Sequence, residues 1–304
     1  MTLEMPKERT AIAHLTLVPY IKVSEELKTK PTQHSVKELR SLGLQPDCLI
    51  CRLEKELPKD EKNKIASFCS VHPDSVISMH DADTVYSIPL LLHHQGVDKI
   101  LMKSLNIKQS KKPNLNDWKR VVKAKLNPKK EANIAIVGKY VELKDSYKSL
   151  NEALDHAGII NKAKVNLTFI DAAKINKSNV KKNLSFADAV LVPGGFGERG
   201  IEGMIIACQF ARESNIPYFG ICLGMQIAVI EFARNILGFK NANSTEFNPK
   251  TKFPVIGLVT EWKDKSGNTE YRDDSSDLGG TMRLGGQTCI LRKSSLSHKL
   301  YKDN

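Results

Sequence analysis

Short apolar runs alternate with amphipathic runs along most of the chain, and this alternation constrains the fold more than any other feature. Strand-like runs lie at 12–18, 47–53, 75–79, 133–137, 164–170, 187–192 and 217–221, and helix-like runs lie at 35–42, 61–69, 88–105, 147–156 and 202–212. Strands that alternate with helices predict parallel sheets covered by helices. We therefore predict an α/β protein of two open parallel-sheet domains.

A basic segment at 108–131 separates the two sets of runs. It holds nine basic and two acidic residues, whereas the whole chain of 304 residues has a net charge of +12. A chain of this length favours two domains at ~150 residues each. Trp118 is the segment's only aromatic residue, and prolines lie near both ends. We predict a solvated linker with a short helix between domains at 1–107 and 132–304, and no nucleic-acid surface.

Composition and cysteine usage narrow the class further. Hydrophobic residues make up 41% of the chain, and the longest clean apolar run is the five residues at 88–92, far short of a membrane span. The first residues lack the apolar block of a signal peptide. We expect a cytoplasmic protein with no membrane partner. Six scattered cysteines predict reduced thiols rather than a disulfide scaffold.

Two patterns resemble metal sites only superficially. Cys48 and Cys51 form C-x-x-C inside an apolar strand, with no second cysteine or histidine pair at zinc spacing, so a core strand is favoured. His93 and His94 are adjacent on an expected helix and have no carboxylate at ligand spacing. We predict no metal ligands among these residues.

The motif YFGICLGMQ at 218–226 places a cysteine between an apolar strand and the start of a helix. Gly220 and Gly224 stand two residues on either side of Cys222, which is the spacing of a nucleophile elbow. The helix N-terminus would favour negative charge on the sulfur and offer free N–H groups to an oxyanion. We predict that Cys222 is a nucleophile; a small cysteine buried at a strand end is the alternative.

A glycine cluster, PGGFGERG at 193–200, follows another strand. Clustered glycines let backbone N–H groups approach an anion or a carbonyl oxygen closely, although a flexible turn is the alternative. Loops that follow parallel strands meet at the carboxyl edge of the sheet. We therefore expect this loop to lie beside Cys222 and to supply half of an oxyanion hole.

Together these motifs resemble the class I glutamine amidotransferases, and further segments narrow the resemblance to the CTP synthase family. These segments are HLTLVPY (14–20), KTKPTQHSVKELRSLGLQPD (28–47), IEFARN (230–235), NSTEF (243–247) and DLGGTMRLG (277–285). The resemblance implies a partial amidoligase domain of the P-loop type followed by a partial class I glutamine amidotransferase domain. An unrelated α/β hydrolase with a cysteine elbow is disfavoured by KTKPTQ.

The resemblance implies glutamine hydrolysis in the second domain. Cys222 would attack the carboxamide carbon of glutamine, and the backbone N–H groups of Gly195 and Leu223 would hold the oxyanion while ammonia leaves. Glutamine would be bound by Gly195, Leu223, Gly224, Met225, Gln226 and Glu246. The carboxylate of Glu246 suits the α-ammonium group of glutamine.

For the first domain the resemblance implies nucleotide binding. UTP, or CTP as an inhibitor, would contact Lys28, Thr29, Lys30, Pro31, Thr32, Gln33 and Lys64. Two lysines and two threonines just before a helix also suit a polyphosphate. The adenine of ATP would lie near His80, Asp81 and Ala82. The implied reaction is ATP-dependent amination of UTP to CTP, with Mg²⁺ accompanying ATP, GTP as allosteric activator and a homotetramer as the assembly.

Two departures from the family pattern leave alternatives open. No G-x-x-x-x-G-K-[ST] phosphate loop occurs, so the Mg²⁺ ligands are expected outside this chain. His298 is the only histidine after Cys222, and its polar surroundings do not suit a catalytic base; the family's histidine and glutamate are expected beyond Asn304. The hypotheses are an incomplete CTP synthase chain and an inactive truncated relative acting as a nucleotide-binding or regulatory subunit.

Overall fold

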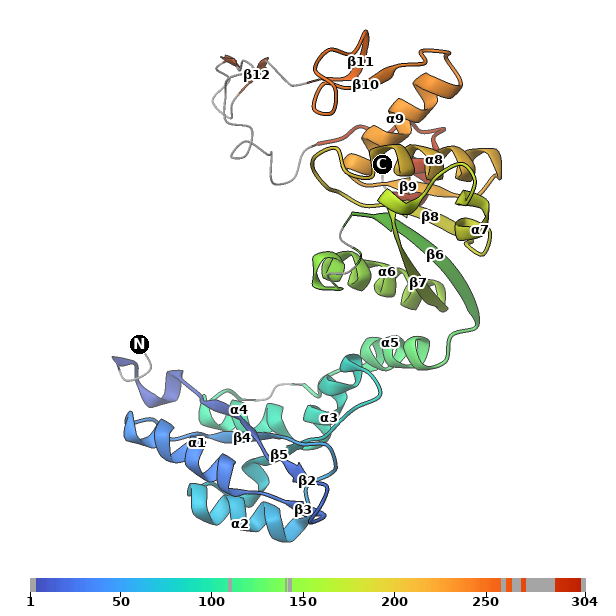
Figure 1. Ribbon diagram of the computed structural model, residues 1–304. Helices are drawn as coiled ribbons and strands as arrows, with labels where there is room; N and C mark the ends of the chain where they lie inside the picture. The colour runs from blue at the N-terminus through green and yellow to red at the C-terminus, as the bar shows by residue number, and fades with distance from the viewer. Residues whose placement is uncertain are drawn as a thin grey trace. The chain divides into compact units, whose positions relative to one another are not determined.

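The computed structural model describes residues 4–108, 111–139, 141, 144–257, 261–263, 269–271 and 288–301 (Figure 1). The chain divides into two compact units, Met1–Glu231 and Phe232–Asn304. This division falls inside helix α9 (Leu223–Asn235). The first unit contains two separate parallel sheets covered by helices, so the predicted α/β class is confirmed.

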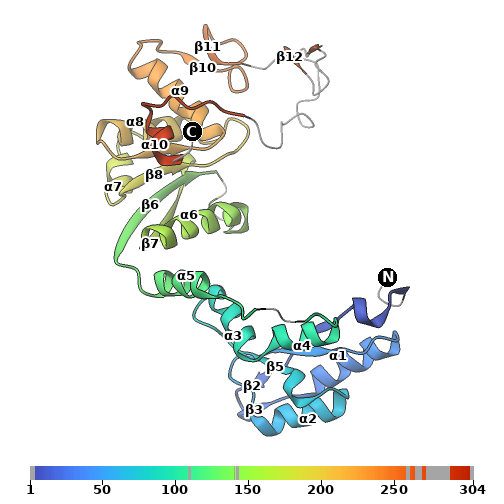
Figure 2. The same ribbon diagram turned by 180° about the vertical axis from the view of Figure 1, so that it is seen from behind.

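The first sheet has three parallel strands in the order β1 (Ala13–Leu17), β4 (Cys48–Arg52) and β5 (Val76–Met79). A short hairpin of β2 (Tyr20–Ile21) and β3 (Glu26–Leu27) follows β1. One face packs against helices α1 (Lys30–Ser41) and α2 (Lys59–Cys69), whose Val36 and Ile65 are buried with Leu49. On the other face, Cys48 and Ile77 pack with Val97. Figure 1 and Figure 2 show these two layers around the sheet.

The single helix expected at 88–105 is wrong, because the chain forms α3 (Ile88–His94) and α4 (Val97–Ser104) with a break at Gly96. Gly96 has a φ of 76°, a left-handed conformation that glycine adopts without steric cost. The side chain of Gln95 exchanges two 2.8 Å hydrogen bonds with the backbone of Ser78 in β5. The sheet therefore fixes the position of the break.

The short helix predicted within the basic segment is α5 (Asn116–Leu126). The segment ends in regular structure, because β6 (Lys130–Gly138) begins at Lys130. Lys125 forms an ion pair with Asp155 of α6 (Lys148–Asn161). The basic segment is therefore anchored through at least one of its lysines and is not entirely solvated.

The second sheet has four parallel strands in the order β7 (Ala163–Asp171), β6, β8 (Ala189–Val192) and β9 (Tyr218–Gly220). Its helices are α6, α7 (Val180–Leu184), α8 (Ile201–Glu213) and the start of α9. The core strands β6 and β8 bury Ile136, Val137 and Val190 completely. Because all four strands are parallel, the segments that follow β6, β8 and β9 leave the sheet at the same edge.

The second unit contains the end of α9 and several short elements. These are the parallel pair β10 (Ala242–Ser244) and β11 (Phe253–Ile256), the antiparallel pair β12 (Glu261–Lys263) and β13 (Thr269–Tyr271), and α10 (Leu296–Tyr301). The motif DLGGTMRLG at 277–285 lies outside the described residues. Among the helices of the described ranges, none combines the length and the apolar character that a bilayer crossing requires.

Candidate functional site

Cys222 lies at a sharp turn between β9 and α9. Its φ of 52° places it in the left-handed region, which a residue with a Cβ occupies at a cost of about 1–3 kcal/mol. Only Ile221 and Cys222 separate the end of β9 from Leu223, the first residue of α9. The thiol is exposed. The predicted nucleophile elbow is therefore present in the backbone.

The two glycines around Cys222 are required by close packing. A Cβ on Gly220 would lie 2.3 Å from the carbonyl carbon of Gly224, and a Cβ on Gly224 would lie 2.1 Å from the carbonyl oxygen of Val192. Real Cβ atoms do not approach so closely, so a side chain at either position would push α9 away from the sheet. The spacing of the glycines thus keeps the start of α9 against β8 and β9.

The glycine loop lies beside the elbow, as expected. A Cβ on Gly194 would lie 3.6 Å from the Cβ of Cys222, and a Cβ on Gly195 would lie 3.4 Å from Cδ2 of Leu223. Within the described part of the chain, neither Gly195 nor Leu223 uses its backbone N–H in a hydrogen bond. The structure therefore brings the thiol and two available N–H groups together.

The other predicted glutamine-binding residues fall into two groups. Gly224, Met225 and Gln226 form the first turn of α9 after Leu223, and the Oε1 atom of Gln226 is buried without a hydrogen-bond partner among the described residues. Such an acceptor suits a bound polar ligand. Glu246 is exposed and belongs to the second unit, where its backbone N–H donates to Ser244 Oγ at 3.2 Å.

A polar cluster supports the elbow, with Cys208 and Glu231 buried and Arg212 and Tyr218 half-buried. The Tyr218 hydroxyl donates to the carbonyl of Gly224 at 2.8 Å, which ties the first turn of α9 to β9. Burial raises the pKa of Tyr218, and it raises the pKa of Cys208 to about 12, so both stay neutral at physiological pH. Sequence reasoning missed this cluster; a charged residue inside an apolar helix, as at Glu231, was the available signal.

Lys139, which sequence reasoning also missed, joins the end of β6 to the glycine loop. Its side chain is buried, and its Nζ donates to the carbonyl of Phe196 at 2.8 Å and to that of Gly197. The carbonyl of Lys139 accepts from the guanidinium of Arg199. A lysine placed directly after the apolar strand IAIVG was the signal that could have found it.

The prediction that the segment KTKPTQ (28–33) lies just before a helix is only partly right, because its last four residues belong to α1. α1 begins at Lys30, because proline is compatible with the first helical turn and Pro31 lies there. Thr32 is fully buried and its hydroxyl donates to the carbonyl of Leu17 at 3.0 Å. Thr29 is also buried and accepts a hydrogen bond from Gln33. The exposed members of the segment are Lys28, Lys30 and Pro31.

The structure brings Lys28 and Lys64 toward one acidic residue. Lys28 donates to Glu26 at 2.5 Å, and this hydrogen bond is the main cause that lowers the pKa of Glu26. The positive charge of Lys64 adds a smaller effect of the same sign. Lys64 also pairs with Glu61 at 3.4 Å. Two of the lysines predicted to bind UTP or CTP therefore share a neighbourhood at the surface.

The predicted adenine segment follows β5 directly. Asp81 pairs with Arg52, the last residue of the neighbouring strand β4, and both Asp81 and Ala82 are exposed. His80 is half-buried, and its Nδ1 has no hydrogen-bond partner within the described ranges. These residues lie at the carboxyl edge of the first sheet, where ligands of open α/β sheets bind.

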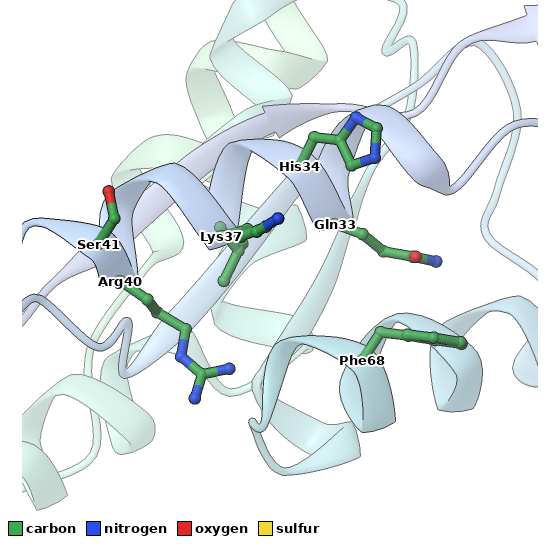
Figure 3. A pocket seen from close by; sticks show the side chains of 7 residues that line it. Gln33, His34, Lys37, Arg40, Ser41 and Phe68 are labelled. Carbon is green, nitrogen blue, oxygen red and sulfur yellow. The ribbon is translucent and has the colours of Figure 1, made fainter.

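A groove of about 530 Å³ runs along α1 and includes one predicted residue, Gln33. Figure 3 shows Gln33, Lys37 and Arg40 along α1, and Phe68 on α2. Phe68 is 65% exposed, which is unusual for a ring of this size. The helical spacing of Lys37 and Arg40 could have indicated a basic face, whereas the position of Phe68 depends on how α2 packs.

The C-x-x-C pattern is a core feature. Cys48 and Cys51 are three residues apart in β4 and therefore point to opposite faces of the sheet. Burial raises the pKa of each thiol to about 11.

His93 pairs with Asp98 at 3.0 Å, and the break at Gly96 brings this carboxylate close. Among the described residues, no group of three or more His, Cys, Asp or Glu side chains is placed to hold a metal ion.

Two family models match parts of this chain. Residues 142–303 match the family model of class I glutamine amidotransferases. The chain belongs to this family. Residues 1–107 match the model of the CTP synthase N-terminus, which makes this amidotransferase CTP synthase-like. It is also similar to the CTPS glutaminase domain of Trypanosoma brucei with bound acivicin, at 36% identity and a TM-score of 0.46. The match covers 56% of this chain and 62% of that one, less than two thirds.

Proposed function

We propose that this chain carries the glutamine-hydrolysing and nucleotide-binding parts of a CTP synthase. The observation that supports this most is the left-handed Cys222 beside the available N–H groups of Gly195 and Leu223. That geometry provides a nucleophile and an oxyanion site in one place. The match of residues 1–107 to the CTP synthase N-terminus supports UTP as the acceptor of the ammonia.

The proposed chemistry at Cys222 proceeds in two steps. The thiolate forms a bond to the carboxamide carbon of glutamine, and the negative charge moves to the carbonyl oxygen, where Gly195 and Leu223 N–H groups stabilise it. The C–N bond then breaks, the nitrogen takes up the proton that the thiol gave up, and ammonia departs, so that Cys222 carries a thioester. Water hydrolyses the thioester to glutamate and regenerates the thiol. A single oxyanion donor is worth about 10²–10³ in rate.

The nucleotide half of the proposal rests on the first sheet. Lys28 and Lys64 provide positive charge for the triphosphate of UTP or CTP, and Gln33, another predicted contact, lines the groove along α1. In the overall reaction ATP would activate the uracil oxygen that ammonia then replaces. Mg²⁺ would accompany ATP in this half, and the steps at Cys222 do not involve it.

Covalent labelling tests the glutamine half directly. The chloromethyl ketone analogue of L-glutamine is expected to alkylate Cys222, and L-glutamine is expected to slow the reaction while D-glutamine is not. Mass spectrometry of the full chain locates the adduct, Cys222→Ala removes it, and the exposed Cys289 serves as an internal control. Equal labelling of the two cysteines, or equal protection by both enantiomers, would contradict the proposed site.

One observation favours the second hypothesis, in which the chain is an inactive subunit. Within the described ranges, no side chain forms a hydrogen bond with the Cys222 sulfur, and such a partner is how a base activates a thiol. Ammonia release from glutamine by the purified chain separates the two hypotheses. Release that Cys222→Ala abolishes supports the enzyme, whereas CTP binding without adduct or ammonia supports a nucleotide-binding subunit.

A further inference from the structure

Lys139 forms reciprocal contacts with the glycine loop. It follows β6 directly and is 4% exposed, and its ammonium donates to the carbonyls of Phe196 and Gly197. In the opposite direction, Arg199 donates to the carbonyl of Lys139. Hydrogen bonds donated in both directions thereby join the loop that carries Gly195 to the residue that follows β6.

A buried ammonium is costly, which distinguishes this lysine from a residue that only fills space. Moving an ammonium out of water costs several kcal/mol after relaxation, and the carbonyl groups that it contacts offset part of that cost. Methionine would fill a similar volume without a charge. The need to fill space therefore does not explain a lysine here, whereas the hydrogen bonds of its ammonium do.

These contacts hold one end of the segment that contains the oxyanion donor. The other end is held at β8, where the carbonyl of Val192 accepts from the N–H of Ile221 at 3.0 Å. Between the two ends lies the Gly194–Gly195 peptide, whose residues have wide backbone freedom. A Cβ on Gly195 would lie 3.5 Å from Cδ of Lys139, so the lysine stem also packs against this peptide.

We propose that Lys139 is a positioning residue of the amidotransferase site. Its ammonium fixes the peptides of Phe196 and Gly197, and this restricts Gly194–Gly195 to the orientation in which the Gly195 N–H is available beside Cys222. The inference rests on the proposed function, because the orientation of that N–H matters for reaction rate only where an oxyanion forms. The restraint on the loop itself is independent of any reaction.

Hydrogen exchange tests the restraint. In the full chain, Lys139→Met is expected to speed amide exchange at 194–199 at least tenfold, while Lys181→Met, an exposed lysine of α7, leaves it unchanged. Unchanged exchange at 194–199 in Lys139→Met would overturn the proposal. Should Lys139→Met fail to fold by circular dichroism, Lys139→Gln decides, because it also removes the ammonium but keeps a polar end at this position; unchanged exchange there overturns the proposal as well.

Alkylation of Cys222 tests the consequence for the site. The rate with the L-glutamine chloromethyl ketone is divided by the rate with iodoacetamide, which needs no oxyanion donor. Lys139→Met is expected to lower this ratio about tenfold, part of the 10²–10³ that a lost donor costs, and Lys181→Met is expected to leave it unchanged. An unchanged ratio would overturn the role in positioning. A wild-type chain without preference for the L-enantiomer would instead overturn the proposed function, and hydrogen exchange would still decide whether Lys139 restrains the loop.

Discussion

Gly224 is the residue whose replacement tests the elbow most sharply. A Cβ at this position would lie 2.1 Å from the carbonyl oxygen of Val192, which is backbone and cannot move aside as a side chain can. Gly224→Ala is therefore expected to shift the start of α9, with a loss of about 1–3 kcal/mol in the free energy of unfolding. The shift should also slow labelling of Cys222 by the glutamine chloromethyl ketone at least tenfold.

The matched control for that change is Gly257→Ala. A Cβ on Gly257 meets no atom within 4 Å, and its φ is not in the left-handed region. Denaturant unfolding and the labelling rate of both variants are measured together. If Gly224→Ala labels as fast as Gly257→Ala, the close contact between α9 and β8 does not position the thiol.

The buried thiols predict how stability responds to alkaline pH. Burial raises the pKa of Cys51 from 9.0 to about 11, so the folded protein keeps this proton more tightly than the unfolded chain does. The unfolded chain therefore binds fewer protons between pH 9 and 11, and the free energy of unfolding falls as pH rises through this window. Cys51→Ala should flatten the fall by about 2–3 kcal/mol.

Denaturant titrations at pH 8, 9, 10 and 11 check this expectation. The variant's pH-independent loss of packing is removed by comparing each protein with itself at pH 8. The exposed Cys222 provides the control, since Cys222→Ala leaves the buried thiol in place. Identical pH dependence in wild type and Cys51→Ala would show that this thiol does not titrate differently in the folded state.

At the residue scale, the sequence predicted what is local and missed what is not. Gly220, Cys222 and Gly224 were recognisable because an elbow is defined by residues two positions apart. Lys139 was not, because the carbonyl of Phe196 that it contacts lies 57 positions away. The buried hydroxyls of Thr29 and Thr32 also depend on packing, since their surroundings are set by the junction between β1 and α1.

At the scale of elements, α8 and α9 are joined by an ion pair between a half-buried arginine and a buried glutamate. Arg212 donates to both carboxylate oxygens of Glu231, at 2.8–3.1 Å, and Glu231 is 2% exposed. The hydrogen bond to Glu231 is the main cause that raises the pKa of Arg212. This pair holds α9, and with it the thiol at its start, against the neighbouring helix.

Removing the arginine should be costly, because it takes a charged hydrogen-bond donor away from a buried carboxylate. Arg212→Leu is expected to lower the free energy of unfolding by about 2–3 kcal/mol, below the 3–5 kcal/mol of fully buried pairs because Arg212 is partly hydrated. Glu213→Gln is the matched control, since Glu213 contacts the same guanidinium at 3.4 Å but is exposed. Equal midpoints in urea for the two variants would contradict a stabilising role for the pair of Arg212 and Glu231.

The pattern of apolar residues predicted most elements and failed at their interruptions. Helix spacing continues through residues 88–105, yet the chain breaks at Gly96, where Gln95 is bonded to Ser78, a residue 17 positions earlier. The start of α1 moved to Lys30 because Pro31 fits a first helical turn as well as a loop. The spacing of apolar residues shows neither tertiary contacts nor whether a proline belongs to a loop or to the first turn of a helix.

At the scale of the molecule, each sheet carries some of its predicted residues at the carboxyl edge, as Cys222 after β9 and His80 after β5 show. Alternation of strands and helices was enough to predict this, because parallel strands of one sheet all end on the same side. The groove along α1 was not predictable, because it combines the basic face of one helix with Phe68 from another. Topology therefore located the two candidate sites, and packing determined which side chains line them.

Around the first sheet, removal of a lysine and removal of a neighbouring glutamate charge are expected to change nucleotide affinity in opposite directions. Lys28 and Lys64 lie near Glu26, which competes with a phosphate for their positive charge. We expect Lys28→Ala and Lys64→Ala each to weaken CTP and UTP binding about tenfold, since a hydrogen bond to a charged group is worth about 1.5–3 kcal/mol. Glu26→Gln should strengthen binding about two- to fivefold.

Calorimetry of the full chain with CTP and with UTP, at low and at high salt, measures these affinities. Lys59→Ala is the control for the lysines, because Lys59 is exposed at the start of α2 and outside the shared neighbourhood of Glu26. Binding that depends on the charges should weaken as salt rises, and the three charge variants should then converge toward wild type. Equal losses from Lys59→Ala and Lys28→Ala, or weaker binding by Glu26→Gln, would place the triphosphate elsewhere on the molecule.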